Sequence, residues 1–554
     1  MHANSIERKL SALVIAASFA LVTIVLSSYF AAALNTTRGP SPIYFCAALL
    51  CYLISSRFAL MLAIFLFPLL PNLTNQASLI LIPSVPYYIT HAAVDITVGL
   101  YVGFIFKTVS TRSTFGNNRF LWPVGAALIL ICISTAIAIT RNLRQMHLQF
   151  HFEDLFFSFI RFKHLTSGSD YLPIADLIVY IGAVTFFFVL LNTLKEETEK
   201  DSILFKPLIL GLIVSSLWGI FQATTGFGLG HNTNGYRPEW VGFGANGFQL
   251  DIHSFAAHML VGAVGLLEYI RTKKLTSLIF FLAVLAITLS WIALILSKSR
   301  ASVVLAVVSI TLYYFFILIK NSHILLKIFK WLFITSLILF SISILTMDFA
   351  WLATSLSALS PNNPKGFAAL NELSSKRLEI FRAVLLMFEQ FPLGGVGQGN
   401  LLRLSKMSNY SQSPYMIEAG GENAHNYFLQ TLAELGIIGI LVFISVFIWP
   451  IHKARSHLVR LTPAILCIFS IFLGNLYSHS LIIRENLFFL AATVALLYAQ
   501  SMSPTCRFNV VRSCACTSHQ KTISLFLLLL VSALLIGWAY EFYQSLFIFP
   551  FFTE

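Results

Sequence analysis

Long runs of apolar residues recur from one end of the chain to the other. Each run is long enough, or nearly so, to cross a hydrocarbon core of about 30 Å as a helix of about 20 residues. The runs lack the two-residue alternation of a membrane β-barrel strand, so helices are expected. The expected spans are residues 10–34, 42–56, 58–70, 90–109, 120–140, 173–194, 205–226, 252–270, 275–297, 301–319, 328–350, 425–450, 461–477, 482–500 and 522–545. The pattern predicts an all-α, polytopic membrane protein with about 12 to 15 transmembrane helices.

Three polar stretches interrupt the apolar pattern and define the expected organisation. Residues 141–172 and 227–251 lie within an N-terminal transmembrane bundle, 1–350. A long loop, 351–424, separates this bundle from the C-terminal transmembrane helices, 425–554, and a loop of this length is usually functional. The loop contains apolar residues at helical spacing, which predict an amphipathic helix: Leu373, Leu378, Ile380, Phe381, Val384, Leu385 and Phe388.

Composition and charge place the polar stretches relative to the membrane. The chain is 57% hydrophobic and 11% charged, with a mean hydropathy of +0.80, which excludes an ordinary soluble domain. If the N-terminus is cytoplasmic, alternate loops on that side hold more than half of the 36 basic residues, and the three polar stretches face the periplasm. This orientation requires the short runs 42–56 and 58–70 to be separate spans. The net charge of +13 then belongs to loops that face anionic lipid, and no nucleic-acid partner is expected.

Two further features bear on the compartment and on metals. The first run follows Arg8 and Lys9 and is too long for a cleaved signal peptide, so it is interpreted as a signal anchor. The seven cysteines all fall in expected spans or in the last cytoplasmic loop, so no disulfide framework is expected. Cys514, Cys516 and His519 are too few ligands to predict a metal site, and no cofactor is expected.

The first two polar stretches contain candidate site residues. Residues 141–172 mix aromatic and charged residues at helical spacing, which suits an amphipathic helix on the membrane surface. Residues 227–251 are rich in Gly and Asn, and they bring Arg237 and Asp251 close to His253 and His258 at the start of the next span. An ordered loop that lines a site is one interpretation of this stretch.

Arginines at the membrane boundary indicate where chemistry is expected. Arg300 lies beside Lys298 between two apolar runs, and an arginine at this depth either snorkels to the interface or serves a site. Arg377 and Arg382 lie on the expected loop helix, five residues apart, so at most one of them faces a site shared with Arg300. The alternative is a surface helix that carries its charges into solvent.

His425 ends the long loop and opens the next span. Its ordinary pKa near 6.5 allows it to accept a proton at neutral pH, which lysine and arginine do not do. The alternative is an interfacial histidine that only caps a helix. Arginine binds phosphate through two parallel hydrogen bonds, so the arginines and His425 together suggest a phosphate or diphosphate site with one base beside it. No periplasmic Asp-x-Asp motif or carboxylate cluster for Mg²⁺ is evident, so arginines would take the place of a metal.

Three motifs in this region resemble a known family. "SKSRAS" at 297–302, "KRLEIFRAVLLMFEQFPLGGVGQGN" at 376–400 and "HNYFLQTLAELGIIG" at 425–439 are similar to signatures of the bacterial O-antigen ligase and O-antigen polymerase superfamily, which includes protein O-oligosaccharyltransferases. "GGVGQG" within the second motif is not a dinucleotide fingerprint, because no strand precedes it. The resemblance implies a GT-C-type membrane glycosyltransferase of the bacterial inner membrane. It also implies a periplasmic site that takes a glycan from undecaprenyl diphosphate without a metal.

The resemblance assigns roles to individual residues. His425 is the expected catalytic base, and Arg300 and Arg377 are the expected diphosphate ligands. Arg382 has no counterpart in the family pattern, so its role stays open. The remaining candidate contacts to donor or acceptor are Lys298, Arg382, Arg237, His253 and Asn426.

The acceptor is the least constrained part of the prediction. A ligase with lipid A–core as acceptor is expected first, and a polymerase or a protein O-oligosaccharyltransferase with the same donor is the alternative. The chain has no large extra periplasmic C-terminal domain, which favours the first two. A flippase or another transporter of lipid-linked glycan is a remoter alternative, because the motifs lie at the membrane rim and no two halves of the chain match.

Overall fold

The protein is represented by a computed structural model in which most of the expected spans are helices. The structure describes residues 42–73, 92–111, 121–145, 172–197, 199–228, 244–273, 275–320, 371, 376–407, 410, 421–455 and 458–502. Within these ranges the regular elements are all helical. The expected spans 10–34, 328–350 and 522–545 lie outside the described residues, as do Arg237 and most of the predicted surface helix in 141–172.

The elements follow one another in the order of the predicted spans. They are α2 (Pro42–Ile54), α3 (Ser56–Leu66), α5 (Ala92–Thr111), α6 (Trp122–Gln145), α8 (Leu172–Glu196), α9 (Lys200–Thr225), α11 (Ile252–Leu260), η2 (Val261–Gly265), α12 (Leu267–Thr272), α13 (Ser277–Leu296), α14 (Arg300–Lys320), α18 (Arg377–Gln390), α19 (Leu401–Leu404), α21 (Tyr427–Lys453), α22 (Leu458–Gly474), η4 (Ser480–Ile482) and α23 (Arg484–Ser501). Six helical stretches in the described ranges are long and apolar enough to cross a membrane. The chain is therefore a polytopic, all-helical membrane protein.

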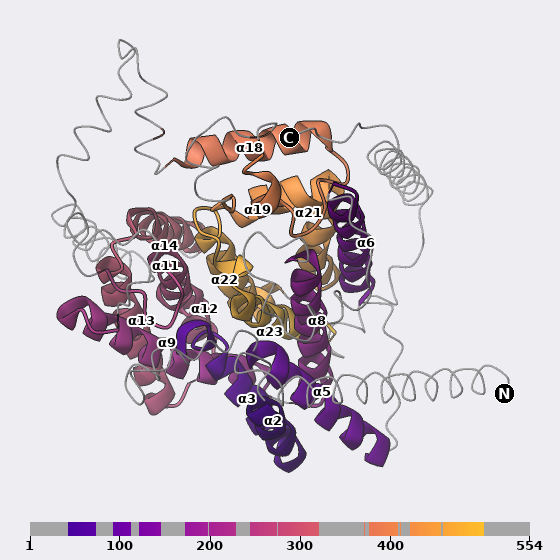
Figure 1. The fold of residues 1–554 in the computed structure, drawn as a ribbon. Helices are drawn as coiled ribbons and strands as arrows, with labels where there is room; N and C mark the ends of the chain where they lie inside the picture. Colours follow the sequence, from indigo (N-terminus) through magenta and orange to yellow (C-terminus); the bar gives the residue numbers. More distant parts are fainter. Residues whose placement is uncertain are drawn as a thin grey trace, which may run out of the picture.

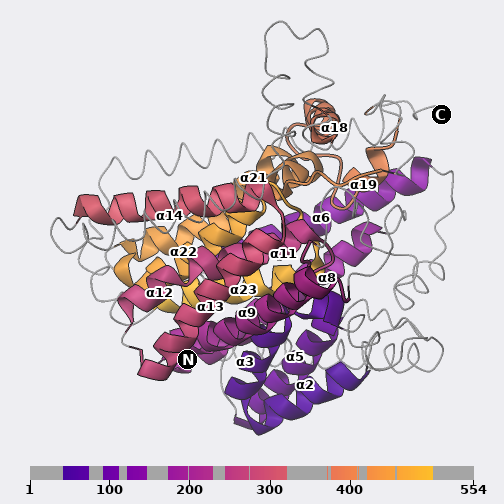
Figure 2. The same cartoon turned by 90° about the vertical axis from the view of Figure 1, so that its left-hand side faces the viewer.

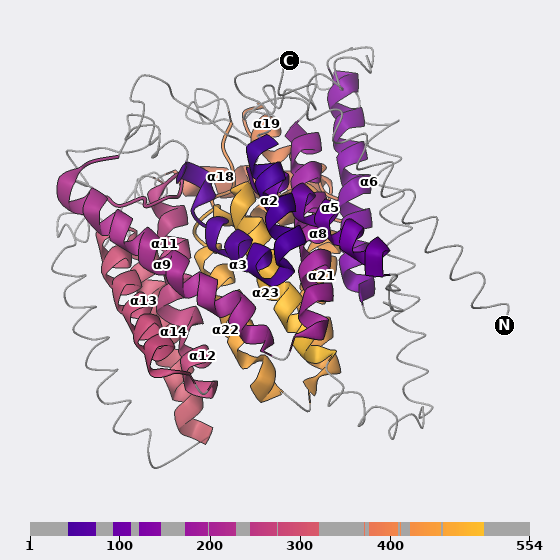
Figure 3. The same ribbon diagram turned by 90° about the horizontal axis from the view of Figure 1, so that it is seen from below.

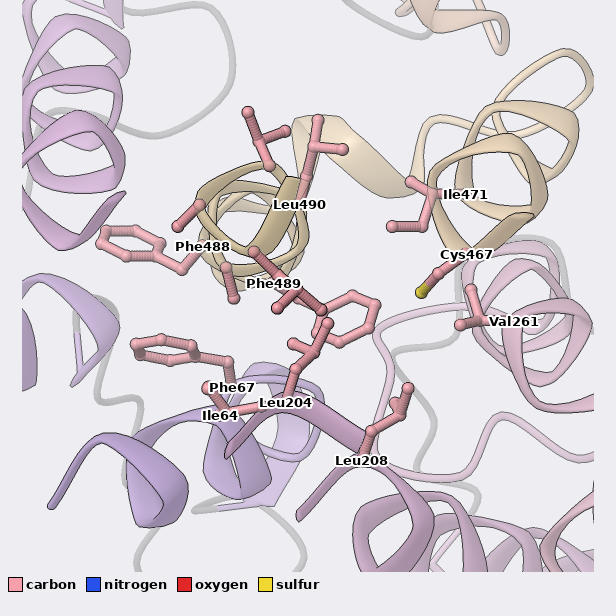
Figure 4. Close-up of a cluster of buried hydrophobic side chains, with 14 of the residues drawn as sticks. Ile64, Phe67, Leu204, Leu208, Val261, Cys467, Ile471, Phe488, Phe489 and Leu490 are labelled. Atoms are coloured by element: carbon pink, nitrogen blue, oxygen red, sulfur yellow. The ribbon is translucent and has the colours of Figure 1, made fainter. Parts of the chain in front are cut away.

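Apolar side chains from many helices form one large core. Phe67 packs edge-on against Phe186, with ring centroids 4.9 Å apart, and lies 5.2 Å from the ring of Phe488. Figure 4 shows this region: Phe67 lies beside Phe488 of α23, and Cys467 and Ile471 of α22 lie on the other side of the cluster, near Val261. Two views place α22 and α23 in the middle of the bundle, between α13 and α14 on one side and α6 and α8 on the other (Figures 1 and 3). Because α22 and α23 are both held in the middle of the bundle, the short turn between them, residues 475–483, is held in place at one end of the bundle.

Charged side chains gather where α3, α8, α9 and α12 meet, and this region is called the basic end. Arg57, at the junction of α2 and α3, lies 3.3 Å from Glu197, just beyond the end of α8. Lys107 donates to Ser56 at 3.1 Å, and Lys273 lies 2.6 Å from Asp201. The two short apolar runs at 42–56 and 58–70 thus form two helices whose junction lies at the basic end.

The loop helix predicted from the long polar loop is α18. It lies across the end of the bundle in Figure 1 and is seen almost end-on in Figure 2. Ile380, Ala383, Val384 and Met387 are its buried residues, at the spacing of one helical face. Most of this face packs into a second, smaller core with Phe391, Val396, Leu401, Leu404, Tyr410, Ala424 and Ala433. Burial of this face fixes α18 over the start of α21.

The glycine-rich segment after α18 packs against a break in α21. Gly436 has φ +64°, so the helical hydrogen bonds are interrupted there. The neighbouring segment replaces them: Val396 N–H donates to Ala433 O at 2.8 Å, and Ile437 N–H donates to Pro392 O at 2.9 Å. A Cβ on Gly436 would lie 2.2 Å from the carbonyl oxygen of Leu393. The glycines of "GGVGQG" therefore serve a close backbone crossing that joins α18 to α21.

Replacing Gly436 by alanine is expected to lower the free energy of unfolding by roughly 2 to 4 kcal/mol, because both the positive φ and the close carbonyl oppose a Cβ. The measurement is the midpoint of thermal unfolding in detergent micelles. Gly125→Ala is the control, because a Cβ on Gly125 in α6 would meet no atom within 4 Å. Equal midpoints for the two variants would contradict the crossing.

Candidate active site

Three helices of the bundle, α11, α14 and α21, begin at the end that α18 covers, and α18 begins there too. Asp251 caps α11, Asn426 caps α21, Lys376 precedes α18, and Arg300 is the first residue of α14. The N-terminus of a helix carries unpaired N–H groups and a partial positive charge. This end is therefore suited to bind an anionic group such as a phosphate.

Two histidines and two carboxylates form a continuous chain of contacts at this end. His425 Nδ1 lies 3.1 Å from His479 Nδ1, and the two rings are nearly perpendicular. His425 Nε2 faces Glu422 Oε1 at 3.5 Å, and His479 Nε2 faces Asp251 Oδ2 at 3.3 Å. The order is Glu422, His425, His479, Asp251, and the members come from the loop before α21, the turn after α22 and the start of α11.

Asp251 divides its two carboxylate oxygens between two tasks. Oδ1 accepts from the N–H groups of His253 and Ser254, at 2.8 and 2.9 Å, and so caps α11. Oδ2 accepts from the Ser254 hydroxyl and faces His479. Burial alone would raise the pKa of this carboxyl, but the hydrogen bond and the charge of His479 hold it well below its ordinary value. Asp251 is therefore ionised at neutral pH.

The surroundings of His425 favour its neutral form. Burial lowers the pKa of its imidazole, and the charges of His479 and Arg377 lower it further, while Glu422 acts in the opposite direction. A neutral imidazole has one nitrogen with a free lone pair. His425 is therefore in the form that accepts a proton at neutral pH.

Arg377 faces the same cluster from α18. Burial lowers the pKa of its guanidinium, whereas Tyr477 and Asp251 raise it. Because arginine has an ordinary pKa above 12, it stays charged. Arg377 thus brings a permanent positive charge to the two histidines from the helix that covers this end of the bundle.

The motif around Arg300 joins the site through its serines. His253 Nδ1 lies 3.2 Å from the hydroxyl of Ser299, which also accepts from the hydroxyl of Ser302. Arg300 follows Ser299 directly and is half-buried. Lys298 is exposed, although partial burial of its ammonium lowers its pKa below the ordinary value. The His253 contact therefore holds the start of α14 beside the start of α11.

Backbone strain marks each of the three motifs. Among the described residues, Lys298, Lys376 and His425 are the non-glycine residues with positive φ, at 58°, 64° and 45°. This conformation is uncommon outside glycine and tends to occur at active sites. Lys298 and His425 are site candidates, and Lys376 stands directly before Arg377. The residues with strained backbone therefore lie in the motifs that were expected to carry the chemistry.

Residues 283–444 match the family model described as O-antigen ligase. The match covers less than a third of the chain and supports a relationship to the O-antigen ligase superfamily. The matched segment includes Arg300, Arg377, Glu422 and His425, and no curated protein matches the chain. The match supports an activity of the O-antigen ligase or polymerase type, which is that of a membrane glycosyltransferase-like enzyme with a lipid-linked glycan and a lipid acceptor.

The remaining candidates lie apart from the two histidines or have structural contacts. Arg382 is exposed on the outer face of α18. Asn426 accepts from Phe428 N–H and Leu429 N–H and donates to Leu476 O, so both ends of its amide position α21. His258 is buried beside the ring of Phe489.

Sequence reasoning gave no role to three members of the chain of contacts. Glu422 stands three residues before His425, a spacing that could have indicated it. Asp251 was placed at the mouth of a span without a task. His479 lies in a short turn between two spans on the expected periplasmic side, where a histidine is a usable signal. Asp251 and His479 also lie outside the segment that matches the O-antigen ligase family.

Proposed function

We propose that the protein is an O-antigen ligase that transfers a glycan from undecaprenyl diphosphate to lipid A–core. The reaction takes place at the periplasmic face of the bacterial inner membrane, is inverting and uses arginines in place of a metal. One observation supports the proposal most: the charge of Arg377 acts on His425, and the contact of His253 with Ser299 holds the start of α14, at Arg300, beside the start of α11.

The proposed reaction is a single displacement. His425 Nε2 takes the proton of the acceptor hydroxyl while the oxygen of that hydroxyl forms a bond to the anomeric carbon. The bond between the anomeric carbon and the phosphate oxygen breaks, and its electrons leave with the diphosphate. Arg300 and Arg377 stabilise the negative charge on that leaving group. Glu422 faces Nε2 and stabilises the imidazolium that forms.

The orientation of the helices supports a periplasmic site. Arg57, Lys107 and Lys273 lie at the basic end. The helices α9, α13 and α21 connect that end to the site, so the two lie on opposite sides of the bundle. The positive-inside rule places the basic end in the cytoplasm, and both lipid substrates then reach the site by diffusion within the outer leaflet.

The acceptor is tested by supplying the purified protein with undecaprenyl-diphosphate glycan, with and without lipid A–core. Product that requires lipid A–core is the expected result. A ladder formed from the donor alone would establish a polymerase instead. Product formed only with a serine- or threonine-containing protein would establish a protein O-oligosaccharyltransferase. Flipping of the donor in liposomes with no transfer to any acceptor would establish a transporter.

The rate of transfer is expected to fall on acidification only below about pH 6.5, the ordinary pKa of histidine. Protonation removes the lone pair of His425, and its pKa is lowered by burial and by the charge of Arg377. The base form therefore predominates at pH 7 and is lost as the pH falls through the lowered pKa. A profile of kcat against pH checks this, and a half-maximal rate above pH 7 would contradict it.

A further inference from the structure

We propose that Asp251 and His479 act on His425 as a relay, in which they select the tautomer that leaves Nε2 free and share the proton that His425 takes. The inference rests on the proposed transfer reaction and adds two positioning residues to it. Neither residue lies in the segment that matches the O-antigen ligase family.

Two neutral histidines carry two hydrogens between them, and the shorter carboxylate contact, that of Asp251 at 3.3 Å against 3.5 Å for Glu422, favours one placement of them. The ionised carboxylate of Asp251 only accepts, so His479 Nε2, at 3.3 Å, carries a hydrogen. The other nitrogen of a neutral His479, Nδ1, then has the lone pair. The two Nδ1 atoms are 3.1 Å apart and share one hydrogen, which must come from His425. His425 Nε2 is therefore left with the lone pair that the reaction needs.

The surroundings of the pair are compatible with this placement. Glu422 Oε1 already accepts from the N–H and the side-chain amide of Asn423, at 3.0 and 2.9 Å, so it needs no hydrogen from His425. Burial would raise the pKa of Glu422, but the hydrogen bond and the charge of a protonated His425 lower it overall, and the carboxylate stays ionised. Glu422 is therefore ionised and accepts a hydrogen bond from Nε2 once that nitrogen is protonated.

Other titratable groups face the pair from neighbouring helices. Arg377 faces it from α18, and its charge acts on His425. His253 faces it from α11, but burial lowers the pKa of its imidazole to about 4, so it is neutral at neutral pH. Tyr477 lies in the same turn as His479, and burial raises the pKa of its hydroxyl, so it stays neutral. Glu422 and Asp251 are the two carboxylates whose contacts with the histidines are described above.

The relay consists of two coupled proton transfers. The acceptor hydroxyl gives its proton to His425 Nε2, and the hydrogen on His425 Nδ1 moves to His479 Nδ1. His425 is then neutral again, and the positive charge rests on His479 beside the carboxylate of Asp251. The pair has gained one proton, which solvent removes after the product leaves. The relay therefore moves positive charge away from the anomeric carbon, where positive charge also develops.

Asp251→Asn is the most direct test because the two oxygens of Asp251 have separate tasks. Asparagine caps helices as well as aspartate does, so an amide oxygen in place of Oδ1 keeps α11 in position. The amide nitrogen then replaces Oδ2 and donates to His479 Nε2, which forces a hydrogen onto His479 Nδ1. That hydrogen faces His425 Nδ1, and the hydrogen of a neutral His425 must move to Nε2. The variant thus presents the wrong tautomer of the base.

The expected result for Asp251→Asn is a kcat about 10- to 100-fold lower, with the KM for undecaprenyl-diphosphate glycan unchanged within about threefold. The acid limb of the pH profile moves to lower pH, because loss of the carboxylate makes the protonated pair less stable. Asp201→Asn is the matched control. Asp201 pairs with Lys273 at the basic end, far from the site, so wild-type kinetics are expected.

A second pair of variants decides the matter if Asp251→Asn does not fold. His479→Asn keeps an amide oxygen near the position of Nδ1, which can still accept from His425, whereas His479→Ala keeps nothing. A higher kcat for His479→Asn than for His479→Ala supports the relay. Equal loss in the two variants with an unmoved acid limb overturns it, as does wild-type kcat in Asp251→Asn. Absence of transfer by the wild-type protein would instead overturn the proposed function.

Discussion

Replacing His425 by alanine is expected to reduce kcat for glycan transfer by about 10³-fold while donor binding is retained. A positioned base contributes about 10²- to 10⁴-fold, and His425 is the proposed base, with Nδ1 facing His479 and Nε2 facing Glu422. The diphosphate ligands stay in place, so the KM for the donor is expected to change little. Steady-state kinetics with purified protein in nanodiscs measure both quantities.

Two controls separate the loss of the base from a structural effect. His425 has φ +45°, which an alanine tolerates poorly. Asparagine tolerates this conformation better, so His425→Asn is expected to fold normally and to lose as much activity as His425→Ala. His452 lies in the last turn of the same helix, α21, and His452→Ala is expected to retain wild-type kcat. Normal transfer by a folded His425→Asn variant would rule out the base assignment.

Replacing Arg377 by lysine is expected to lower kcat/KM by about 10²-fold or more, although the charge is kept. A guanidinium donates two parallel hydrogen bonds to a phosphate, whereas an ammonium acts as a point charge. Removal of one donor to a developing negative charge costs about 10²- to 10³-fold. Because Arg377 is proposed to stabilise the departing diphosphate, the loss is expected to appear mainly in kcat.

Arg382 provides the matched control on the same helix. It is one of the exposed residues of α18, five residues from Arg377, so Arg382→Lys is expected to leave transfer within about twofold of wild type. Similar losses in the two variants would mean that α18 acts through its overall charge. That outcome would contradict a specific diphosphate contact by Arg377.

Periodicity was sufficient to predict most of the helices near the site. The apolar positions of the long loop predicted α18, although only Ile380 and Val384 among them are on its buried face and Leu385 is exposed. The five-residue spacing implied that Arg377 and Arg382 point in different directions. The short runs before and after Ser55 also became separate helices, because the serine side chain caps α3. These features depend on local spacing and local hydrogen bonds, which the sequence records directly.

The relay and the break in α21 could not be predicted in the same way. His479 is 54 residues from His425, and Asp251 is farther still, so their contacts depend on how α11, α21 and α22 pack. The glycine-rich segment gave a turn but not its partner, since its hydrogen bonds go to the interrupted backbone around Gly436. Such contacts arise from tertiary packing, which no local pattern specifies.

The most direct test of the proposed reaction is to identify the lipid product released during transfer. The purified protein would receive undecaprenyl-diphosphate glycan and lipid A–core, and both products would be quantified by mass spectrometry. The proposed displacement breaks the bond between the anomeric carbon and the phosphate oxygen, so one undecaprenyl diphosphate is expected for each glycan transferred. Release of undecaprenyl monophosphate, or of a glycan that retains a phosphate, would contradict the displacement at this site.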